Sequence, residues 1–242
     1  MITSDNFEAA RQAAIQGTRP PLSLAILADF ERLVAHKGIS LRGGLHYQDF
    51  DLRGAICCTA EEATLLYHMA DMHRPLDALE IGCYVGWSTA HIATATPLTC
   101  IDPFTELDGY PGFDPALRFG ANIARCGLSL RVRLIRGASP EAVRQTGPSL
   151  DFVYIDGHHH DGQPMRDALA IFPLLTEDAL VIWHDAELDE VAQAIGWMSG
   201  QGFETLKLDT PNSLTLLYRR RPVWLGDLLA VARVQALTLE YA

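Results

Sequence analysis

Residues 76–95 read LDALEIGCYVGWSTAHIATA, and this stretch decides the fold. The apolar run that ends at Ile81 predicts a buried strand, and Gly82 allows the chain to turn sharply at its end. Gly86 lets the backbone approach a ligand at the start of the next helix, which is predicted over 87–95. The stretch therefore predicts a strand, a ligand-binding turn and a helix in direct succession.

The same alternation continues along the chain. Further strands are predicted over 98–102, 131–137, 150–156 and 179–185, and helical segments over 115–127, 139–147, 165–175 and 187–202. Five strand–helix alternations predict a parallel sheet with helices on both faces, and right-handed crossovers make it doubly wound. The last two apolar runs, 203–209 and 213–220, are joined by a turn too short to return a parallel strand. The predicted fold is therefore α/β, a Rossmann-like seven-stranded sheet, mostly parallel with one antiparallel strand near its edge.

The two ends of the chain differ from this central pattern. Residues 1–75 predict a helical cap region that packs over the carboxyl ends of the strands, with helices over 5–16, 22–36 and 60–73. Residues 76–220 form the predicted sheet domain. Residues 221–242 predict a C-terminal helix with an apolar stripe, which packs on its own domain or forms the interface of a homodimer.

Composition excludes several classes of function. The net charge is −11, with 19 basic against 30 acidic residues, so a nucleic-acid backbone is a poor partner. No apolar run reaches the length of a membrane span, and the N-terminus lacks the basic and apolar regions of a secretory signal. The five cysteines contain no CxxC pair, which indicates reduced thiols rather than disulfides or a zinc cluster. We therefore expect a cytoplasmic protein with a small-molecule substrate.

The glycine spacing bears on the kind of ligand. The turn is not GxGxxG, because Tyr84 stands where close approach of a pyrophosphate needs glycine, so a dinucleotide is disfavoured. Asp102 closes the second predicted strand, where a carboxylate suits the two hydroxyls of a ribose. Ala138 and Ser139, after the third strand, are small enough to leave room for an adenine ring, and Ser139 can also cap the following helix.

Four motifs in this order carry a resemblance. The pattern E-I-G-x-x-x-G-x-S at 80–88, Asp102, GAS at 137–139 and DFVYIDG at 151–157 resemble the class I S-adenosylmethionine-dependent methyltransferases. Within them, roughly residues 60–220 most resemble the small O-methyltransferases typified by the catechol and caffeoyl-CoA enzymes and their bacterial relatives acting on natural products and sugars. The resemblance implies S-adenosylmethionine as cofactor, bound by Glu80, Gly82, Gly86, Trp87, Ser88, Asp102, Ala138, Ser139 and Asp156.

Several of these residues also have a structural interpretation. Glu80, which the resemblance places near the methionine part of the cofactor, can equally be a buried acid satisfied by neighbouring donors. Asp102 and Ser88 can cap helices, and Trp87 can stack on adenine or pack in the core.

Two carboxylates are expected to meet at the sheet edge. Asp156 and Asp185 end adjacent predicted strands, about 5 Å apart, and repel each other unless a cation or proton lies between them. The resemblance implies that they hold a divalent metal that binds the acceptor hydroxyl. Ala186 stands where the catechol-type enzymes place an amide ligand. His184 stands where some bacterial relatives place an acidic ligand, and it would shift the preference from Mg²⁺ toward Mn²⁺, Fe²⁺ or Zn²⁺. Strand alternation, however, directs His184 away from Asp185 until the strand frays.

The three histidines that follow Asp156 are best interpreted singly, because neighbouring side chains diverge. His159 lies where the catechol-type enzymes place a catalytic lysine, and an imidazole there can act as the general base. His158 is the next candidate and can line the acceptor pocket. His160 is expected to face solvent or to cap the following helix. The alternative for all three is a polar loop without catalytic role.

The predicted function is methyl transfer to a hydroxyl group of a small molecule. Basic residues are sparse around the predicted site loops, so a neutral, phenolic or sugar hydroxyl is favoured over a polyanionic acceptor. Residues 38–58 are expected to form part of the acceptor pocket. Two alternatives stay open: a non-catalytic module that binds S-adenosylmethionine, and a nicotinamide-dependent oxidoreductase.

Overall fold

The computed structural model describes residues 58–105, 114–226 and 228. The helices predicted over 5–16 and 22–36, and nearly all of the predicted acceptor segment 38–58, lie outside these residues. The C-terminal helix and its homodimer interface, predicted over 221–242, also lie mostly outside them. The described part is therefore the predicted sheet domain with the helix that precedes it.

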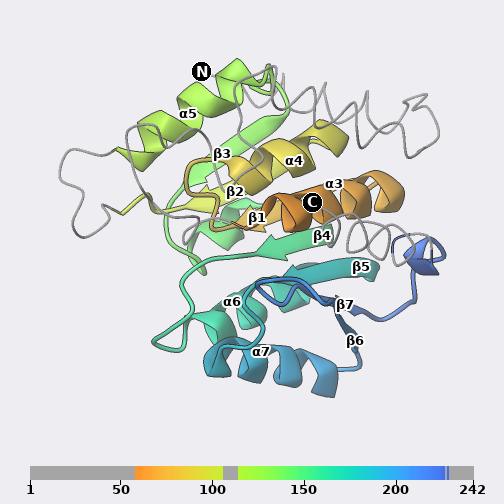
Figure 1. Ribbon diagram of the computed structural model, residues 1–242. Helices are drawn as coiled ribbons and strands as arrows, with labels where there is room; N and C mark the ends of the chain where they lie inside the picture. The colour runs from red at the N-terminus through yellow and green to blue at the C-terminus, as the bar shows by residue number, and fades with distance from the viewer. Residues whose placement is uncertain (1–57, 106–113, 227, 229–242) are drawn as a thin grey trace.

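Seven strands form one sheet in the order β3-β2-β1-β4-β5-β7-β6 (Figure 1). The strands are β1 (Ala78–Ile81), β2 (Leu98–Asp102), β3 (Val132–Arg136), β4 (Leu150–Ile155), β5 (Leu175–Trp183), β6 (Glu204–Lys207) and β7 (Thr215–Tyr218). The first five pair in parallel, and β7 runs antiparallel to both β5 and β6. The predicted doubly wound sheet with one reversed strand near its edge is confirmed.

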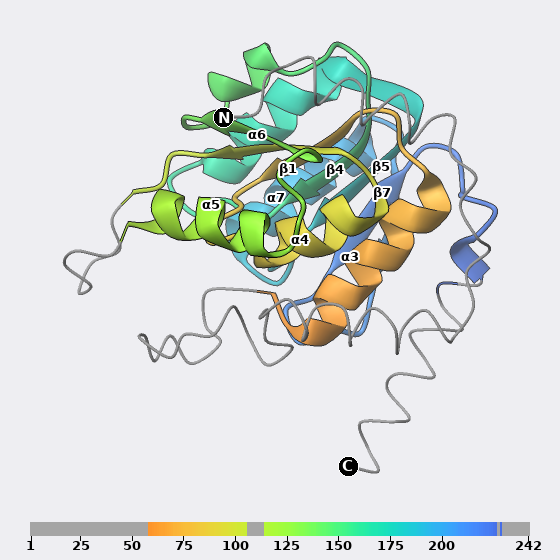
Figure 2. The ribbon, with the colours of Figure 1, turned by 90° about the horizontal axis from the view of Figure 1, so that it is seen from above.

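Helices cover both faces of the sheet (Figures 1 and 2). One face carries α3 (Ala60–His73), α4 (Trp87–Ala95) and α5 (Pro115–Arg125), and the other carries α6 (Gln163–Ile171) and α7 (Asp189–Gly200). Strand β1 is buried along its whole length between the two layers, as its continuous apolar run predicts. The strand order reverses between β1 and β4, so the ligand crevice is expected outside their carboxyl ends.

Two elements differ from the sequence-based expectations. The crossover predicted as a helical segment over 139–147 contains only a short 3₁₀ helix, Ala142–Gln145, because Pro140 and Gly147 leave few residues between them for a longer one. Helix α3 does not lie across the carboxyl ends of the strands. It begins at that edge and runs beside α4 to the amino edge, where Nε2 of His73 lies 2.8 Å from the carbonyl oxygen of Asp151.

Helix α3 is held in this place by its apolar face and by its first turn. Leu65, Leu66 and Met69 are fully buried against the rest of the core. Thr59 and Glu62 form a capping box, in which each side chain accepts a hydrogen bond from the backbone N–H of the other. Glu62 also accepts a hydrogen bond from the N–H of Asn212 and lies beside His184, so the first turn of α3 lies at the carboxyl edge of the sheet. No helix among the described residues is long and apolar enough to cross a membrane.

Candidate active site

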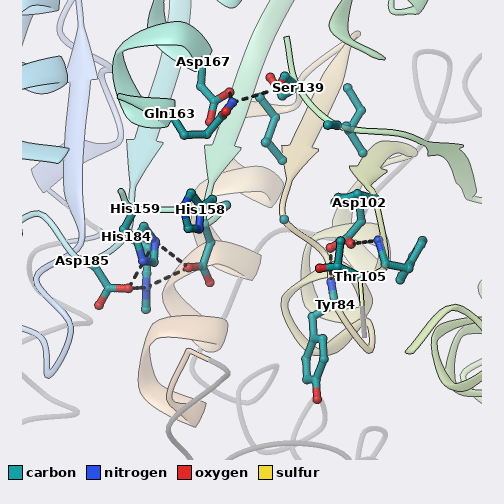
Figure 3. Close-up of a pocket in the computed structure, with 18 of the residues that line it drawn as sticks. Tyr84, Asp102, Thr105, Ser139, His158, His159, Gln163, Asp167, His184 and Asp185 are labelled. Carbon is teal, nitrogen blue, oxygen red and sulfur yellow. Dashed lines mark hydrogen bonds and ion pairs between the residues drawn. The ribbon is translucent and has the colours of Figure 1, made fainter. Parts of the chain in front are cut away.

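A cavity of about 480 Å³ opens at the carboxyl ends of the strands, at the point where the strand order reverses (Figure 3). Its size is within the usual range of small-molecule sites. The polar residues of its lining are Tyr84, Asp102, Thr105, Ser139, Asp156, His158, His159, Gln163, Asp167, His184, Asp185 and Asn212.

The turn after β1 forms the base of this cavity. Gly82 has a φ of +85°, and a Cβ atom built on it would lie 2.0 Å from the carbonyl oxygen of Asp156. Only glycine fits there, because the backbone of the β4 loop packs directly against this turn. Gly86, with a φ of +89°, is the N-cap of α4 but does not line the cavity. Gly82 and Gly86 therefore set the shape of the turn together, and of the two only Gly82 lines the cavity.

Asp102 organises the same turn through its side chain. Its Oδ2 atom accepts hydrogen bonds from the backbone N–H groups of Cys83, at 3.0 Å, and Tyr84, at 2.8 Å. Its Oδ1 atom accepts one from the N–H of Phe104 at 2.6 Å. Figure 3 shows Asp102 beside Tyr84 on the wall of the cavity. Asp102, which was predicted to bind a ribose, therefore also fixes the backbone of the loop around it. Each oxygen of its carboxylate accepts hydrogen bonds along fixed directions.

Another wall of the cavity is built around Ala138 and Ser139, the residues that were predicted to lie against an adenine ring. The Nε2 amide of Gln163 donates to the carbonyl oxygen of Ser139 at 2.8 Å and to Oδ1 of Asp167 at 2.6 Å (Figure 3). Asp167 is almost fully buried, and this burial raises its pKa. Gln163 and Asp167 were not among the predicted site residues, because they lie in a helix without a recognisable motif.

Besides Gly86, three more of the predicted cofactor residues lie behind the cavity wall rather than on it. Glu80 is fully buried and accepts hydrogen bonds from the hydroxyls of Ser88 and Thr89 and from the thiol of Cys100. Trp87 is buried with its ring edge-on to His91, at a centroid distance of 4.5 Å. None of Glu80, Trp87 and Ser88 lines the cavity, so the structure places these three residues under the turn.

At the other end of the cavity, two carboxylates and two imidazoles converge (Figure 3). The Nδ1 atom of His184 lies 3.1 Å from Oδ1 of Asp156 and 3.0 Å from Oδ2 of Asp185. The Nε2 atom of His159 lies 3.6 Å and 3.4 Å from the same two oxygens. The predicted metal residues and the predicted base therefore form one cluster, carried by the loops after β4 and β5.

The end of β5 explains why His184 and Asp185 point the same way. The strand ends at Trp183, and Asp185 has a left-handed backbone with a φ of +51°. Its N–H donates to the carbonyl oxygen of Asn212 at 2.8 Å, which holds this conformation. Strand alternation no longer applies beyond Trp183, so both side chains turn toward Asp156.

In this cluster, the pKa values of Asp156, His159 and His184 are shifted from their ordinary values. Burial lowers the pKa of His184, but the carboxylates of Asp156, Asp185 and Glu62 outweigh it and raise the pKa to about 12. Burial raises the pKa of Asp156, yet the imidazoles of His184 and His159 hold it well below its usual range. Burial also lowers the pKa of His159, whereas Asp156 and Asp185 raise it above its ordinary value. A positive charge is therefore strongly favoured between the carboxylates.

The donor atoms of this cluster fit a divalent cation. One atom each from Asp156, His184 and Asp185 lies within 4.8 Å of the others, as ligands around one ion do. The Nδ1 atom of His184 is buried and has no hydrogen bond of good geometry among the described residues, although it faces two carboxylates. A metal ion between these atoms would be coordinated by one atom of each of the three residues. Mixed carboxylate and imidazole donors suit first-row transition ions.

The other two histidines of the loop lie farther out. The side chain of His158 is 60% exposed and pairs with Asp161 at 3.4 Å, although the residue contributes to the cavity rim. His160 is exposed, and its ring packs edge-on against that of His158. Of the three histidines, His159 alone lies within ion-pair distance of Asp156 and Asp185 among the described contacts.

Two further residues of the site came from parts of the chain where no function was predicted. Glu62 of α3 is fully buried behind His184, and Asn212 precedes β7 and lines the cavity. The one available signal was the pattern Thr59-x-x-Glu62 before an apolar run, which is typical of a helix start and not of a site.

Comparisons with known proteins agree with this geometry. Residues 79–186 match the family model Methyltransf_24, which describes a methyltransferase domain. No curated protein matches the sequence.

Solved structures with a similar fold include three methyltransferases. One is the S-adenosylhomocysteine-bound methyltransferase PaMTH1 of Podospora anserina, with a TM-score of 0.60 and 15% identity, covering 85% of this chain and 100% of that one. Another is the O-methyltransferase TomG of Streptomyces achromogenes, in complex with S-adenosylmethionine, with a TM-score of 0.56, 15% identity and coverage of 90% and 99%. An O-methyltransferase of Bacillus cereus in complex with S-adenosylhomocysteine has a TM-score of 0.54, 14% identity and coverage of 88% and 98%.

The sheet order, the glycine turn and the family match together define the class of protein. The predicted resemblance to the class I S-adenosylmethionine-dependent methyltransferases is confirmed. Residues 79–186 match a methyltransferase domain, and the cavity lies at the carboxyl ends of β1, β2, β4 and β5.

Proposed function

We propose that this protein transfers the methyl group of S-adenosylmethionine to a hydroxyl group of a small molecule, with a divalent cation at Asp156, His184 and Asp185. One observation carries the proposal: the glycine turn and the carboxylate–imidazole cluster meet at Asp156. Gly82 packs against the backbone of Asp156, while the Asp156 carboxylate faces His184. A donor bound at the turn and an acceptor bound at the cluster would therefore be neighbours in one cavity.

The cofactor would span the cavity from Asp102 to the cluster. A ribose hydroxyl would donate to a lone pair of the Asp102 carboxylate that accepts no backbone N–H. The adenine would lie against Ala138 and Ser139. The sulfonium of S-adenosylmethionine supplies an activated methyl group, so the protein contributes mainly positioning.

The lining of the cavity bears on the acceptor. It includes four acidic side chains and, among the described residues, neither lysine nor arginine. A phosphate or carboxylate would be repelled at such a surface, whereas a neutral sugar, alcohol or phenol would not. The solved relatives named as O-methyltransferases also favour oxygen as the methylated atom.

In this proposal, His159 receives the proton of the acceptor hydroxyl. It comes from the loop after β4, is about one quarter exposed, and faces Asp156 and Asp185. These carboxylates stabilise the imidazolium that forms when the proton arrives. A divalent cation in the cluster would lower the pKa of the acceptor hydroxyl and orient it.

Transfer of a labelled methyl group from S-adenosylmethionine to a library of neutral hydroxyl compounds tests this function. We expect labelled products, and we expect His159→Ala to lower turnover by about 10²-fold or more with unchanged affinity for S-adenosylhomocysteine. His160→Ala is the matched control, because this exposed histidine of the same loop should leave turnover unchanged. Unchanged turnover in His159→Ala would remove His159 from the mechanism.

Two further results of the same experiment would contradict the proposal. Full activity after exhaustive chelation would rule out a required cation. Tight binding of S-adenosylhomocysteine without transfer to any acceptor would favour the non-catalytic module instead.

A further inference from the structure

Glu62 is a buried carboxylate that the proposed reaction does not use. Its Oε2 atom accepts hydrogen bonds from the N–H of Thr59 at 2.9 Å and from the amide of Asn212 at 2.9 Å. Its Oε1 atom accepts one from the N–H of Asn212 at 2.8 Å. The capping box of α3 explains the contact with Thr59, but it does not explain why this glutamate reaches across to Asn212 and His184.

The contact with His184 fixes which ring nitrogen faces the cluster. Nε2 of His184 lies 3.4 Å from Oε2 of Glu62, and Nδ1 faces Asp156 and Asp185. The ring is 5% exposed, and the N–H of His184 donates to the carbonyl oxygen of Ile155, so the ring is tightly constrained. A carboxylate beside Nε2 favours the hydrogen on that atom, so a metal ion that displaces the proton of Nδ1 meets the lone pair of Nδ1.

Glu62 also acts on a second residue of the cluster. It holds Asn212 through both the backbone N–H and the side-chain amide. The carbonyl oxygen of Asn212 in turn accepts from the N–H of Asp185, whose left-handed backbone directs its carboxylate to the cluster. One glutamate therefore supports two of the three candidate ligands, and it connects them to the first turn of α3.

We propose that Glu62 is the positioning residue of the metal centre: it holds His184 with Nδ1 toward the ion and thereby makes the centre prefer a first-row transition ion over Mg²⁺. The inference rests on the metal site of the proposed function. An imidazole nitrogen suits Mn²⁺, Co²⁺ or Zn²⁺, whereas Mg²⁺ prefers oxygen donors. Without Glu62, the ring and the turn at Asn212 would lose their common partner, and the nitrogen ligand would be misplaced.

Metal binding in the absence of cofactor and acceptor tests this role. Calorimetric titration with CoCl₂ and with MgCl₂, and the visible absorption spectrum of the Co²⁺ complex, report on affinity and on the ligand field. We expect the wild type to bind Co²⁺ more tightly than Mg²⁺. We expect Glu62→Gln to lower the Co²⁺ affinity by about 10- to 100-fold, to change the spectrum, and to affect Mg²⁺ less.

Two control variants separate positioning from general effects. Thr59→Ala removes the capping hydroxyl of α3 and the hydrogen bond that this hydroxyl donates to Oε2 of Glu62. It leaves Glu62 beside His184, with its hydrogen bonds from Asn212 intact. Asp151→Asn alters another half-buried carboxylate, which accepts the N–H groups of Leu76 and Asp77 at the opposite edge of the sheet. Both should keep the wild-type preference for Co²⁺. An equal loss in Thr59→Ala would overturn the proposal, because the contacts of Glu62 with His184 and Asn212, which this variant keeps, would then not be what holds the ligands.

The outcomes distinguish this inference from the function on which it rests. A wild type that binds neither ion would overturn the metal site itself, and the role of Glu62 with it. A wild type that binds Co²⁺, with a Glu62→Gln variant that matches it within about threefold, would overturn the role of Glu62 alone. If Glu62→Gln does not fold, His184→Gln decides: a retained preference for Co²⁺ would show that the imidazole is not a ligand, which also overturns the proposal.

Discussion

Two buried glutamates on the same side of the sheet have opposite acidities. Glu62, in the first turn of α3, and Glu80, in β1, are both fully shielded from solvent. Burial raises the pKa of each, but hydrogen bonds and the charge of His184 lower that of Glu62 to about 2. The pKa of Glu80 is raised by burial to about 7, and its hydroxyl and thiol donors only partly offset this.

The kind of donor explains the difference. Glu62 faces an imidazole that can carry a positive charge, together with the backbone N–H groups of Thr59 and Asn212. Glu80 is paired with the neutral side chains of Ser88, Thr89 and Cys100. A buried carboxylate is stabilised as an anion by charged and fixed donors, which neutral hydroxyl groups do not replace. Glu62 is therefore part of the electrostatics of the site, whereas Glu80 supports the turn beneath it.

The largest expected effect separates the two glutamates by stability. Glu62→Leu should lower the free energy of unfolding at pH 7 by about 3 kcal/mol or more, because it leaves a buried cationic imidazole and the Asn212 donors without their partner. Glu80→Gln should change it by about 1 kcal/mol or less, since a neutral side chain can still bond to the hydroxyls. Urea denaturation measures both, and equal losses would contradict the comparison.

The second effect is a difference in pH dependence. A raised pKa means that folded Glu80 keeps its proton between pH 4.5 and about 7 while the unfolded chain loses it, so folding becomes less favourable as the pH rises. The free energy of unfolding of Glu80→Gln relative to the wild type should therefore increase across this window and stay constant above it. Urea denaturation at a series of pH values tests this, and a constant difference would show that Glu80 is ionised when folded.

Glu62 should show the opposite pH dependence. Its lowered pKa means that its contribution to stability is complete above its ordinary pKa of 4.5 and is lost as the pH falls toward about 2. The stability difference between wild type and Glu62→Gln should therefore shrink below pH 4.5. Acid titration followed by circular dichroism measures this, and a difference that grows in acid would exclude an ionised Glu62.

The smallest expected effect concerns the cofactor. Glu80 does not line the cavity, so Glu80→Gln should bind S-adenosylhomocysteine within about threefold of the wild type in calorimetry. Gly82→Ala is the contrasting variant, since its Cβ would collide with the backbone of Asp156 and should abolish binding. A tenfold or larger loss in Glu80→Gln would place this glutamate at the cofactor, as the resemblance implies.

Much of the fold and part of the site were predictable from local patterns. The helix over 87–95 and the strand over 98–102 were predicted with the bounds that the structure has, because glycine, charge and apolar runs mark their ends. Asp156 and Asp185 were predictable as neighbours, since parallel strands end at the same edge. The direction of His184 was not predictable, because it depends on where β5 ends and on the backbone of Asp185.

The sequence by itself determined the order of strands and helices, the reversed strand and the edge at which the ligand site lies, because these follow from periodicity and connection length. Only the tertiary structure decided which acidic side chains contact the residues of the site. Glu62 and His184 are separated by 122 positions in the chain, and no local pattern connects them. Their contact forms when α3 packs beside α4 and brings its first turn to the carboxyl edge of the sheet. Burial then replaces water by a few fixed partners, and these partners set the charge of each glutamate.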